Sequence, residues 1–219
     1  MLRRQSELVA ILSRLSHKIK VSKEPRMAKI EKLRAFLADP KNNLSSFPPL
    51  RLPLDPSVFV IGIRAEKASV FKSKMQPLFL HFICQDGSEY PIIFKTGDDM
   101  RQDQLAIQVI TLMDRLLRKE NLDLRLTPYR VLATGADQGM SQYIPSHPLA
   151  SILAENNSSI ISYFRKVNPS LDDPFGVAPS VIDTYLRSCA GYCVITYLLA
   201  VGDRHLDNLL LTPQGNLFH

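Results

Sequence analysis

The chain has 219 residues, of which 45% are hydrophobic and 22% charged; these values are typical of a folded globular protein and exclude a disordered one. Three cysteines are too few for a secreted disulfide framework, which predicts a reducing, cytoplasmic environment. The net charge of +6 is concentrated in residues 1–41, which carry 11 Lys/Arg and 4 Asp/Glu. Because the rest of the chain is nearly neutral, nucleic acid is not an expected partner. We expect the basic segment to be a solvated helix face, with an anionic membrane or a partner surface as alternatives.

The N-terminal part of the chain is expected to be helical. Apolar residues recur at helical spacing over residues 6–20, which predicts an amphipathic helix. A second, shorter helix is expected over residues 30–37, because Pro40 ends the pattern. Four prolines within residues 41–56 then indicate a linker that leads into a new domain.

The middle of the chain has the pattern of a strand-rich block that contains one helix. Strands are expected at residues 58–63, 78–83 and 90–94, with two further short strands at residues 129–133 and 142–144. Asp99 and Gln102 have the spacing of a capping box and predict a long helix that includes residues 105–117. This helix has two adjacent apolar stripes, which we expect to pack against the sheet as core residues.

After Pro145 and Pro148 the pattern becomes helical, with helices expected at residues 148–155, 159–165 and 180–201. The longest apolar stretch, residues 189–201, has 13 residues and is shorter than the roughly 20 needed to cross a bilayer. The order of elements predicts an α+β fold, in which a small antiparallel sheet with a packed helix is joined by a short hinge to a helical lobe.

The segment VGDRHLDNLLL, residues 201–211, carries the most specific chemical signal. Asp203 and Asn208 are five positions apart, as are the aspartate and asparagine of the protein-kinase catalytic loop. In that loop, the aspartate meets the attacking hydroxyl and the asparagine supplies an oxygen ligand to magnesium. The order here is Asp-Arg-His, so that His205, with an ordinary pKa near 6.5, is a second candidate base.

A second signal is YPIIFKTGDDMRQDQ, residues 90–104. Lys95 ends a predicted strand, where its ammonium can pair with a nucleotide phosphate. Asp103, one turn into the next helix, is its expected acidic partner, whereas Asp98 and Asp99 are expected to cap that helix. The turn before this strand, residues 71–76, contains no glycine, which argues against an ordinary protein kinase; a P-loop motif is absent as well.

The two motifs, IIFKTGDDMRQDQ and GDRHLDNLLL, together resemble the phosphatidylinositol 3- and 4-kinase superfamily, which includes related large protein kinases. The runs LMDRLLRKENLDLRLTPYRVLATG and SCAGYCVITYLLAVGDRHLDNLLL are similar to class III phosphatidylinositol 3-kinases, the vacuolar protein sorting lipid kinases. The resemblance implies a two-lobe lipid-kinase catalytic domain, truncated in its C-lobe. Residues 1–46 would be the end of a helical domain and a linker, 47–140 the N-lobe, 141–148 the hinge, and 149–219 a partial C-lobe that ends after the catalytic loop.

The same resemblance implies which residues bind nucleotide. The loop at residues 71–76 would cover the ATP phosphates through Ser73 and backbone amides, and Lys95 would contact the α-phosphate. Ser141 replaces a methionine of the family pattern just before the hinge. Asp103 and Tyr129 would lie behind Lys95. The hinge that hydrogen-bonds adenine would be Gln142, Tyr143 and Ile144, and the apolar walls of the adenine pocket would be Ile93 and Ile144.

The catalytic group implied by the resemblance is Asp203, Arg204 and His205, with His205 the favoured base toward the inositol hydroxyl. Asn208 would bind the metal. The expected cofactor is ATP with Mg²⁺ or Mn²⁺.

The implied reaction is transfer of the ATP γ-phosphate to the 3-hydroxyl of phosphatidylinositol, which supplies phosphatidylinositol 3-phosphate for endosomal sorting and autophagy. The enzyme would be cytoplasmic and peripheral on endosomal and autophagosomal membranes, with a protein-kinase-like scaffold subunit and a Beclin-type subunit as partners. The sequence stops at His219, before the Ile-Asp-Phe-Gly motif whose aspartate is the principal metal ligand, so we expect the 219-residue chain alone to be inactive. The alternatives are a phosphatidylinositol 4-kinase, a related large protein kinase, or a non-catalytic binding module.

Overall fold

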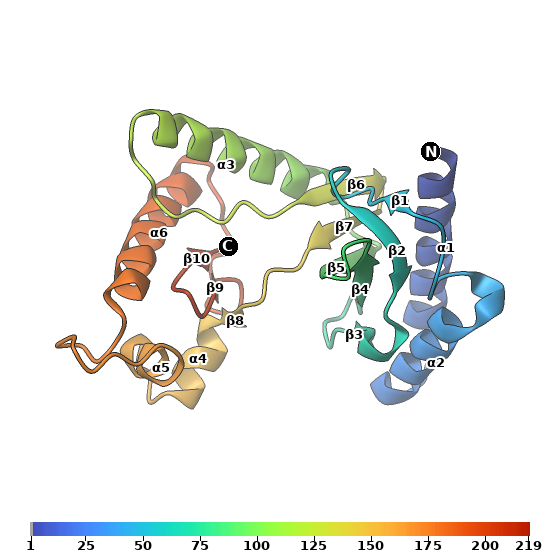
Figure 1. The fold of residues 1–219 in the computed structure, drawn as a ribbon, viewed down its shortest axis with the longest axis horizontal. Helices are drawn as coiled ribbons and strands as arrows, with labels where there is room; N and C mark the ends of the chain where they lie inside the picture. Colours follow the sequence, from blue (N-terminus) through green and yellow to red (C-terminus); the bar gives the residue numbers. More distant parts are fainter. Residues whose placement is uncertain (1) are drawn as a thin grey trace. The chain divides into compact units, whose positions relative to one another are not determined.

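The computed structural model describes residues 2–219, which form two compact units (Figure 1). The first unit comprises the residues up to Ile107 together with Tyr129–Tyr143, and the second comprises Gln108–Pro128 and Ile144–His219. Both units combine helices with antiparallel strands, which confirms the expected α+β class. No helix within residues 2–219 has the length and apolar character needed to span a bilayer.

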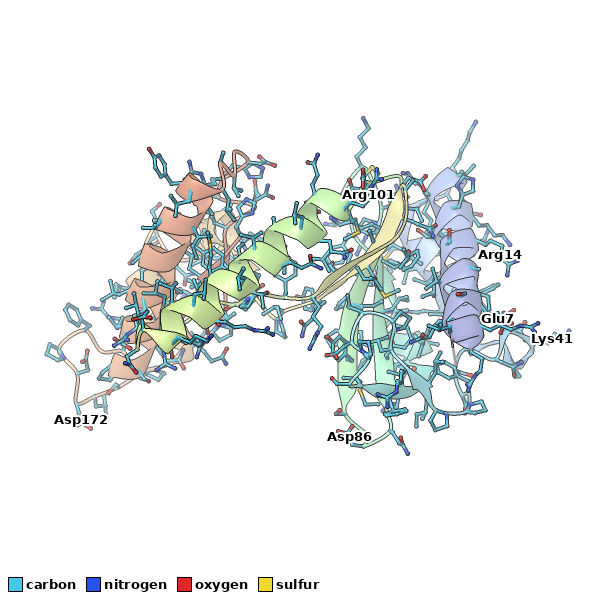
Figure 2. The ribbon with its side chains drawn as sticks, turned by 90° about the horizontal axis from the view of Figure 1, so that it is seen from above. Glu7, Arg14, Lys41, Asp86, Arg101 and Asp172 are labelled. Atoms are coloured by element: carbon cyan, nitrogen blue, oxygen red, sulfur yellow. The ribbon has the colours of Figure 1, made fainter. Side chains whose placement is uncertain are left out.

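The first unit is built on a seven-stranded antiparallel sheet with the order β1-β2-β4-β5-β7-β6, and β3 pairs with β4. The turn between β4 and β5 carries Asp86 at its tip (Figure 2). Three strands confirm predicted ones, namely β2, β4 and β5. The strands are β1 (Leu50–Arg51), β2 (Phe59–Ile63), β3 (Ser69–Val70), β4 (Leu78–Cys84), β5 (Glu89–Thr96), β6 (Val131–Gly135) and β7 (Gln138–Gln142).

The strand predicted at residues 142–144 was misplaced. The observed strand, β7, ends at Gln142, and it forms a hairpin with β6 through a turn at Ala136 and Asp137. The turn lies inside the sequence GADQG, where the glycines on either side belong to the paired strands. The second strand of the hairpin therefore starts four residues earlier than predicted, whereas the first, predicted at residues 129–133, lies at Val131–Gly135.

Two helices, α1 (Leu2–Val21) and α2 (Arg26–Ala38), cover one face of this sheet (Figure 1). Leu12 of α1 and Leu33 of α2 are fully buried in one core with Phe82 of β4 and Phe94 of β5. The N-terminal helices thus share a hydrophobic core with the sheet. Two short 3₁₀ helices, η1 (Pro40–Asn42) and η2 (Ala65–Lys67), lie between α2 and β3.

The basic side chains of α1, α2 and η1 only partly match the expected solvated face. Arg14 and Lys41 do project away from the sheet (Figure 2). Arg26 and Arg34, in contrast, donate hydrogen bonds to the carbonyls of Val70 (2.6 Å) and Ala68 (3.0 Å). Part of the N-terminal positive charge therefore satisfies backbone acceptors beside β3.

Helix α3 (Arg101–Lys119) corrects the prediction of two buried stripes. Ile107 and Ile110 are buried, but Leu105, Leu112 and Leu116 are all more than half exposed. A helix with apolar residues over so wide an arc has more of them than one contact face can bury.

The second unit contains the three predicted helices and a small sheet with the order β10-β9-β8. The last helix, α6, ends at Leu198 rather than at residue 201, because Ala200 adopts a left-handed conformation with φ 51°. Phe164 of α5 and Leu211 of β9 are fully buried in the core of this unit. The elements are β8 (His147–Pro148), α4 (Leu149–Glu155), α5 (Ile160–Val167), α6 (Pro179–Leu198), β9 (Leu210–Leu211) and β10 (Leu217–Phe218).

The shared core of the first unit predicts unequal effects of two identical substitutions in its sheet. Phe94→Ala empties a fully buried site and should lower the free energy of unfolding by about 3–5 kcal/mol. Phe59→Ala removes a ring that is 38% exposed and lies against Arg51, and should cost about 1 kcal/mol. Denaturant unfolding followed by circular dichroism measures both values. Equal losses would contradict the placement of Phe94 in the core.

Candidate active site

One face of the central sheet carries the residues expected to bind nucleotide. Side chains alternate along a strand, so Leu80 and Phe94 point into the core while Phe79, Ile93 and Lys95 lie on the opposite face. The register places Phe79 beside Ile93, Ile93 beside Ser141 and Lys95 beside Gly139. Three neighbouring strands, β4, β5 and β7, therefore build a single surface with an apolar part and a cationic end.

Lys95 forms an ion pair with Asp98, at 3.6 Å between Nζ and Oδ2. The pairing of Lys95 with Asp103 stays a prediction. The turn at Gly97, where φ is +78°, brings the carboxylate of Asp98 back beside the lysine. Asp99 alone performs the predicted capping role, since its Oδ1 accepts from the amide of Arg101 at 3.1 Å. A hydrogen bond from the Arg101 side chain lowers the pKa of Asp99 to about 2.

Asp103 acts on Tyr129, the residue with which the sequence analysis grouped it. Burial raises the pKa of Tyr129 to about 12, and the negative charge of Asp103 adds to the increase. The start of α3 and the segment before β6 are therefore close enough for the carboxylate to influence the phenol. The neighbouring side chain of Gln104 connects α3 to β6 itself, because its Oε1 accepts from the amide of Ala133 at 2.7 Å.

The loop at residues 71–76 connects β3 to β4 and closes without glycine. The amide of Phe71 donates to the carbonyl of Pro77, and the amide of Gln76 donates to the carbonyl of Ser73, both at 3.0 Å. Gln76 takes a left-handed conformation with φ 49°, which is uncommon for a residue other than glycine. Ser73 is exposed on this turn.

The predicted hinge begins where β7 ends. The amides of Gln142 and Tyr143 donate to the carbonyls of Arg130 (2.8 Å) and Pro91 (3.0 Å), so both are occupied. Within residues 2–219, no acceptor takes the amide hydrogen of Ile144, which is the next residue along. That donor is available to a ligand.

Phe79 is a residue that the sequence analysis missed. Its ring lies edge-on to Tyr143, with 4.7 Å between the ring centroids, and it also contacts Phe71 and His81. The signal was present in the strict alternation of residues 78–84, which separates Phe79 from the buried Leu78 and Leu80.

In the second unit, the loop between α6 and β9 brings Asp203, His205 and Asn208 together. Asn208 Nδ2 donates to Asp203 Oδ2 at 2.8 Å, and His205 Nε2 lies 3.3 Å from Asp203 Oδ1. The amide of Asp207 donates to His205 Nδ1 at 3.3 Å, which assigns the ring hydrogen of neutral His205 to Nε2, facing Asp203. Arg204 is directed elsewhere and donates to Thr196 Oγ1 of α6.

His219, to which no role was assigned from the sequence, also contacts this loop. Its Nε2 lies 2.8 Å from the carbonyl oxygen of Asp203, which also accepts from Asn208 Nδ2 at 3.2 Å. The contact depends on how the end of β10 returns to the loop, and no spacing along the sequence signals it.

Asn208 is suited to hold a hard cation. The side-chain amide nitrogen of Asn208 donates to Asp203, and no hydrogen bond among residues 2–219 involves Asn208 Oδ1. An amide oxygen of this kind is a ligand that Mg²⁺ prefers. No group of three or more His, Cys, Asp or Glu side chains in residues 2–219 is arranged to hold a metal. Magnesium in nucleotide sites commonly takes one or two protein ligands and completes its shell with phosphates and water.

The neighbourhood of Tyr129 and Asp103 can be tested by titration. At pH 11, a tyrosine with a pKa of about 12 is roughly one-tenth ionised, whereas one of ordinary pKa is about nine-tenths ionised. Stability linked to this phenol is present below pH 10 and is lost as the pH rises toward 12. The absorbance difference between the wild type and Tyr129→Phe should therefore be small at pH 11. Asp103→Asn should increase it, because the phenolate loses a repelling charge; no change would place Asp103 away from the phenol.

Comparison with known proteins adds to this geometry. Residues 89–219 match the family Phosphatidylinositol 3- and 4-kinase. The chain is 56% identical to Phosphatidylinositol 3-kinase pik3 of Schizosaccharomyces pombe, a match that covers 98% of the chain and 27% of the relative. It is 51% identical to Phosphatidylinositol 3-kinase VPS34 of Arabidopsis thaliana (99% and 27% covered) and 45% identical to that of Saccharomyces cerevisiae (98% and 24%). The chain spans about a quarter of the length of these relatives. With a family match over more than half of its residues, the chain belongs to the phosphatidylinositol 3- and 4-kinase family.

Proposed function

We propose that these residues form the ATP-binding lobe and the catalytic loop of an enzyme that transfers the γ-phosphoryl group of ATP to the 3-hydroxyl of phosphatidylinositol. The observation that carries the proposal is that Asp203, His205 and Asn208 meet on one loop. Asp203 Oδ2 lies 2.8 Å from Asn208 Nδ2, and Asp203 Oδ1 lies 3.3 Å from His205 Nε2. It occurs in a chain whose relatives are named phosphatidylinositol 3-kinases. The roles of individual residues follow from their contacts.

Nucleotide binding is assigned to the sheet face described above. Ile93 and Phe79 supply apolar contacts for adenine, and the free amide of Ile144 is available to a ring nitrogen. Lys95, held by Asp98 with its side chain 31% exposed, can exchange this weak partner for an α-phosphate oxygen. Ser73 and the amides of its turn cover the remaining phosphates.

Metal binding is assigned to Asn208, through its Oδ1. A metal held there would supply positive charge that offsets the charge of the phosphates. Either Mg²⁺ or Mn²⁺ suits an oxygen ligand of this kind.

His205 is proposed as the general base, with Asp203 as its orienting group. The hydrogen on Nε2 faces Asp203, so Nδ1 is the nitrogen that can accept the proton of the inositol hydroxyl. The bond to Nδ1 from the Asp207 amide is long, at 3.3 Å, and a substrate hydroxyl can replace it. Asp203 then stabilises the imidazolium that forms, as a carboxylate beside the second ring nitrogen does in hydrolase triads.

We extend the proposal to a setting at membranes. An enzyme that acts on a lipid must reach the surface of a bilayer, and we propose that this one is a peripheral membrane protein. The class III resemblance further implies endosomal and autophagosomal membranes, a protein-kinase-like scaffold subunit and a Beclin-type subunit. The names of the relatives favour the 3-kinase over a 4-kinase or a protein kinase.

Nucleotide binding provides the first test. ATP with magnesium at about 100 times its Kd should stabilise the wild-type chain by roughly 2.7 kcal/mol, seen as a rise in melting temperature. Lys95→Ala should remove most of this rise, because the phosphate loses its counter-charge. Lys23→Ala, which alters an exposed lysine between α1 and α2, is the control and should keep the full rise. A wild-type chain that gains no stability from ATP would favour the non-catalytic module.

Phosphoryl transfer provides the second test. A protein that contains these residues together with the Ile-Asp-Phe-Gly motif should form phosphatidylinositol 3-phosphate when it is given ATP, magnesium and phosphatidylinositol vesicles. Asp203→Asn should lower kcat by roughly 10²–10⁴-fold with little change in the KM for ATP, because the imidazolium loses its stabilising carboxylate. Asp183→Asn, which alters an exposed ion pair on α6, should leave kcat unchanged.

Identification of the product separates the alternatives. Chromatography of the deacylated lipid distinguishes the 3-phosphate from the 4-phosphate, and labelling of added protein would indicate a protein kinase. An Asp203→Asn enzyme with unchanged kcat would contradict the role given to this loop.

A further inference from the structure

A buried lysine of α2 reaches the back of the loop at residues 71–76. Lys29 is only 4% exposed, and its Nζ donates to Oε1 of Gln76 at 2.7 Å. The nearby carboxylate of Glu24 forms its ion pair with Lys32 instead, at 2.5 Å. Burial of an ammonium group is unfavourable unless its contacts compensate. The bond to Gln76 is the contact that connects this charge to the rest of the first unit.

The acceptor of that bond is the residue at which the loop takes its least favourable conformation. Gln76 has φ 49° and closes the turn through its amide, which donates to Ser73. L-amino acids adopt this region at a cost, so the conformation persists only where neighbours hold it. Lys29 holds the side chain of the same residue whose backbone defines the turn.

A second lysine, from α1, connects the loop to the strand that carries Lys95. Lys20 Nζ donates to the carbonyl of Thr96 at 3.0 Å and lies 3.8 Å from the sulfur of Met75. A Cβ atom at Gly97 would lie 2.5 Å from this Nζ, so the approach requires glycine there. Buried Ser16 reinforces the link through a 2.9 Å hydrogen bond to the hydroxyl of Thr96.

We propose that Lys20 and Lys29 are positioning residues for the phosphates of the nucleotide. The helix pair α1–α2 fixes both the loop over the phosphates and the end of β5 beside Lys95, while neither lysine touches the nucleotide. This inference rests on the proposed function, and it adds a role for the N-terminal helices that the family motifs do not carry. It predicts a selective effect: loss of the contact should weaken binding of the phosphates and leave binding of the adenosine part unchanged.

The test compares the Kd of ATP with that of adenosine, both with magnesium, by competition against a fluorescent ATP analogue. Lys29→Met keeps the length of the side chain and removes its donors. It should weaken ATP binding about tenfold, because binding of the phosphates must then also order the loop, and leave adenosine within about twofold. Lys32→Met is the matched control on the same helix; it breaks only the exposed pair with Glu24 and should change neither Kd.

A second variant removes the same hydrogen bond from the side of the loop, so that the inference can still be tested if Lys29→Met does not fold. Gln76→Asn keeps an amide and suits the left-handed backbone, but its side chain is one methylene too short to reach Lys29. It should reproduce the selective loss of ATP affinity.

Equal weakening of ATP and adenosine in these variants would show a general structural role and overturn the inference, as would unchanged ATP binding in both. A wild-type chain that binds neither compound would contradict the proposed function itself, a result distinct from either of these.

Discussion

The central sheet of the first unit must satisfy two environments at once, because successive side chains of a strand point to opposite faces. In β4 and β5, Phe82 and Phe94 belong to the core beneath α1 and α2, while Phe79 and Lys95 lie on the other face. A register shift of one residue would exchange the two sets and would destroy the core and the site together. The same hydrophobic interaction that folds the sheet therefore fixes the position of the residues to which we assign nucleotide binding.

In the loop proposed to be catalytic, by contrast, the contacts among the three site residues are local. Asp203, His205 and Asn208 meet within six residues, and the amide of Asp207 orients the ring of His205. Most of this geometry depends on a short segment held between the end of α6 and β9. Residues from distant parts of the sequence reach this loop at backbone carbonyls: His219 at that of Asp203, and the amide of Ala150 at that of Leu206, at 3.0 Å. A local arrangement of this kind needs a stable frame at its two ends but few specific partners elsewhere.

This difference explains which features could be predicted from the sequence. The long strands and helices have strong periodicity, and the residues of the loop at 203–208 are close along the chain, so the elements and the grouping of these residues could be predicted. The pairing of Lys95 with Asp98 depends on the positive φ of Gly97, and the contact of His219 depends on the return of β10. Neither leaves a pattern in the sequence. The prediction that both apolar stripes of α3 are buried was wrong for a related reason. Periodicity shows that a helix is amphipathic but not how much of its apolar surface other elements cover.

The distribution of charge is another feature whose structural role could not be predicted from the sequence. Composition identified an excess of positive charge in residues 1–41 and suggested a solvated surface or a membrane contact. In the structure, Arg26 and Arg34 donate to the carbonyls of Val70 and Ala68 beside the short strand β3. Carbonyls at the edge of a sheet that pair with no neighbouring strand need donors, and long cationic side chains supply them from a neighbouring helix without burying their whole length. Lysines and arginines that look like a binding surface for an external anion can therefore act first on the acceptors of their own fold.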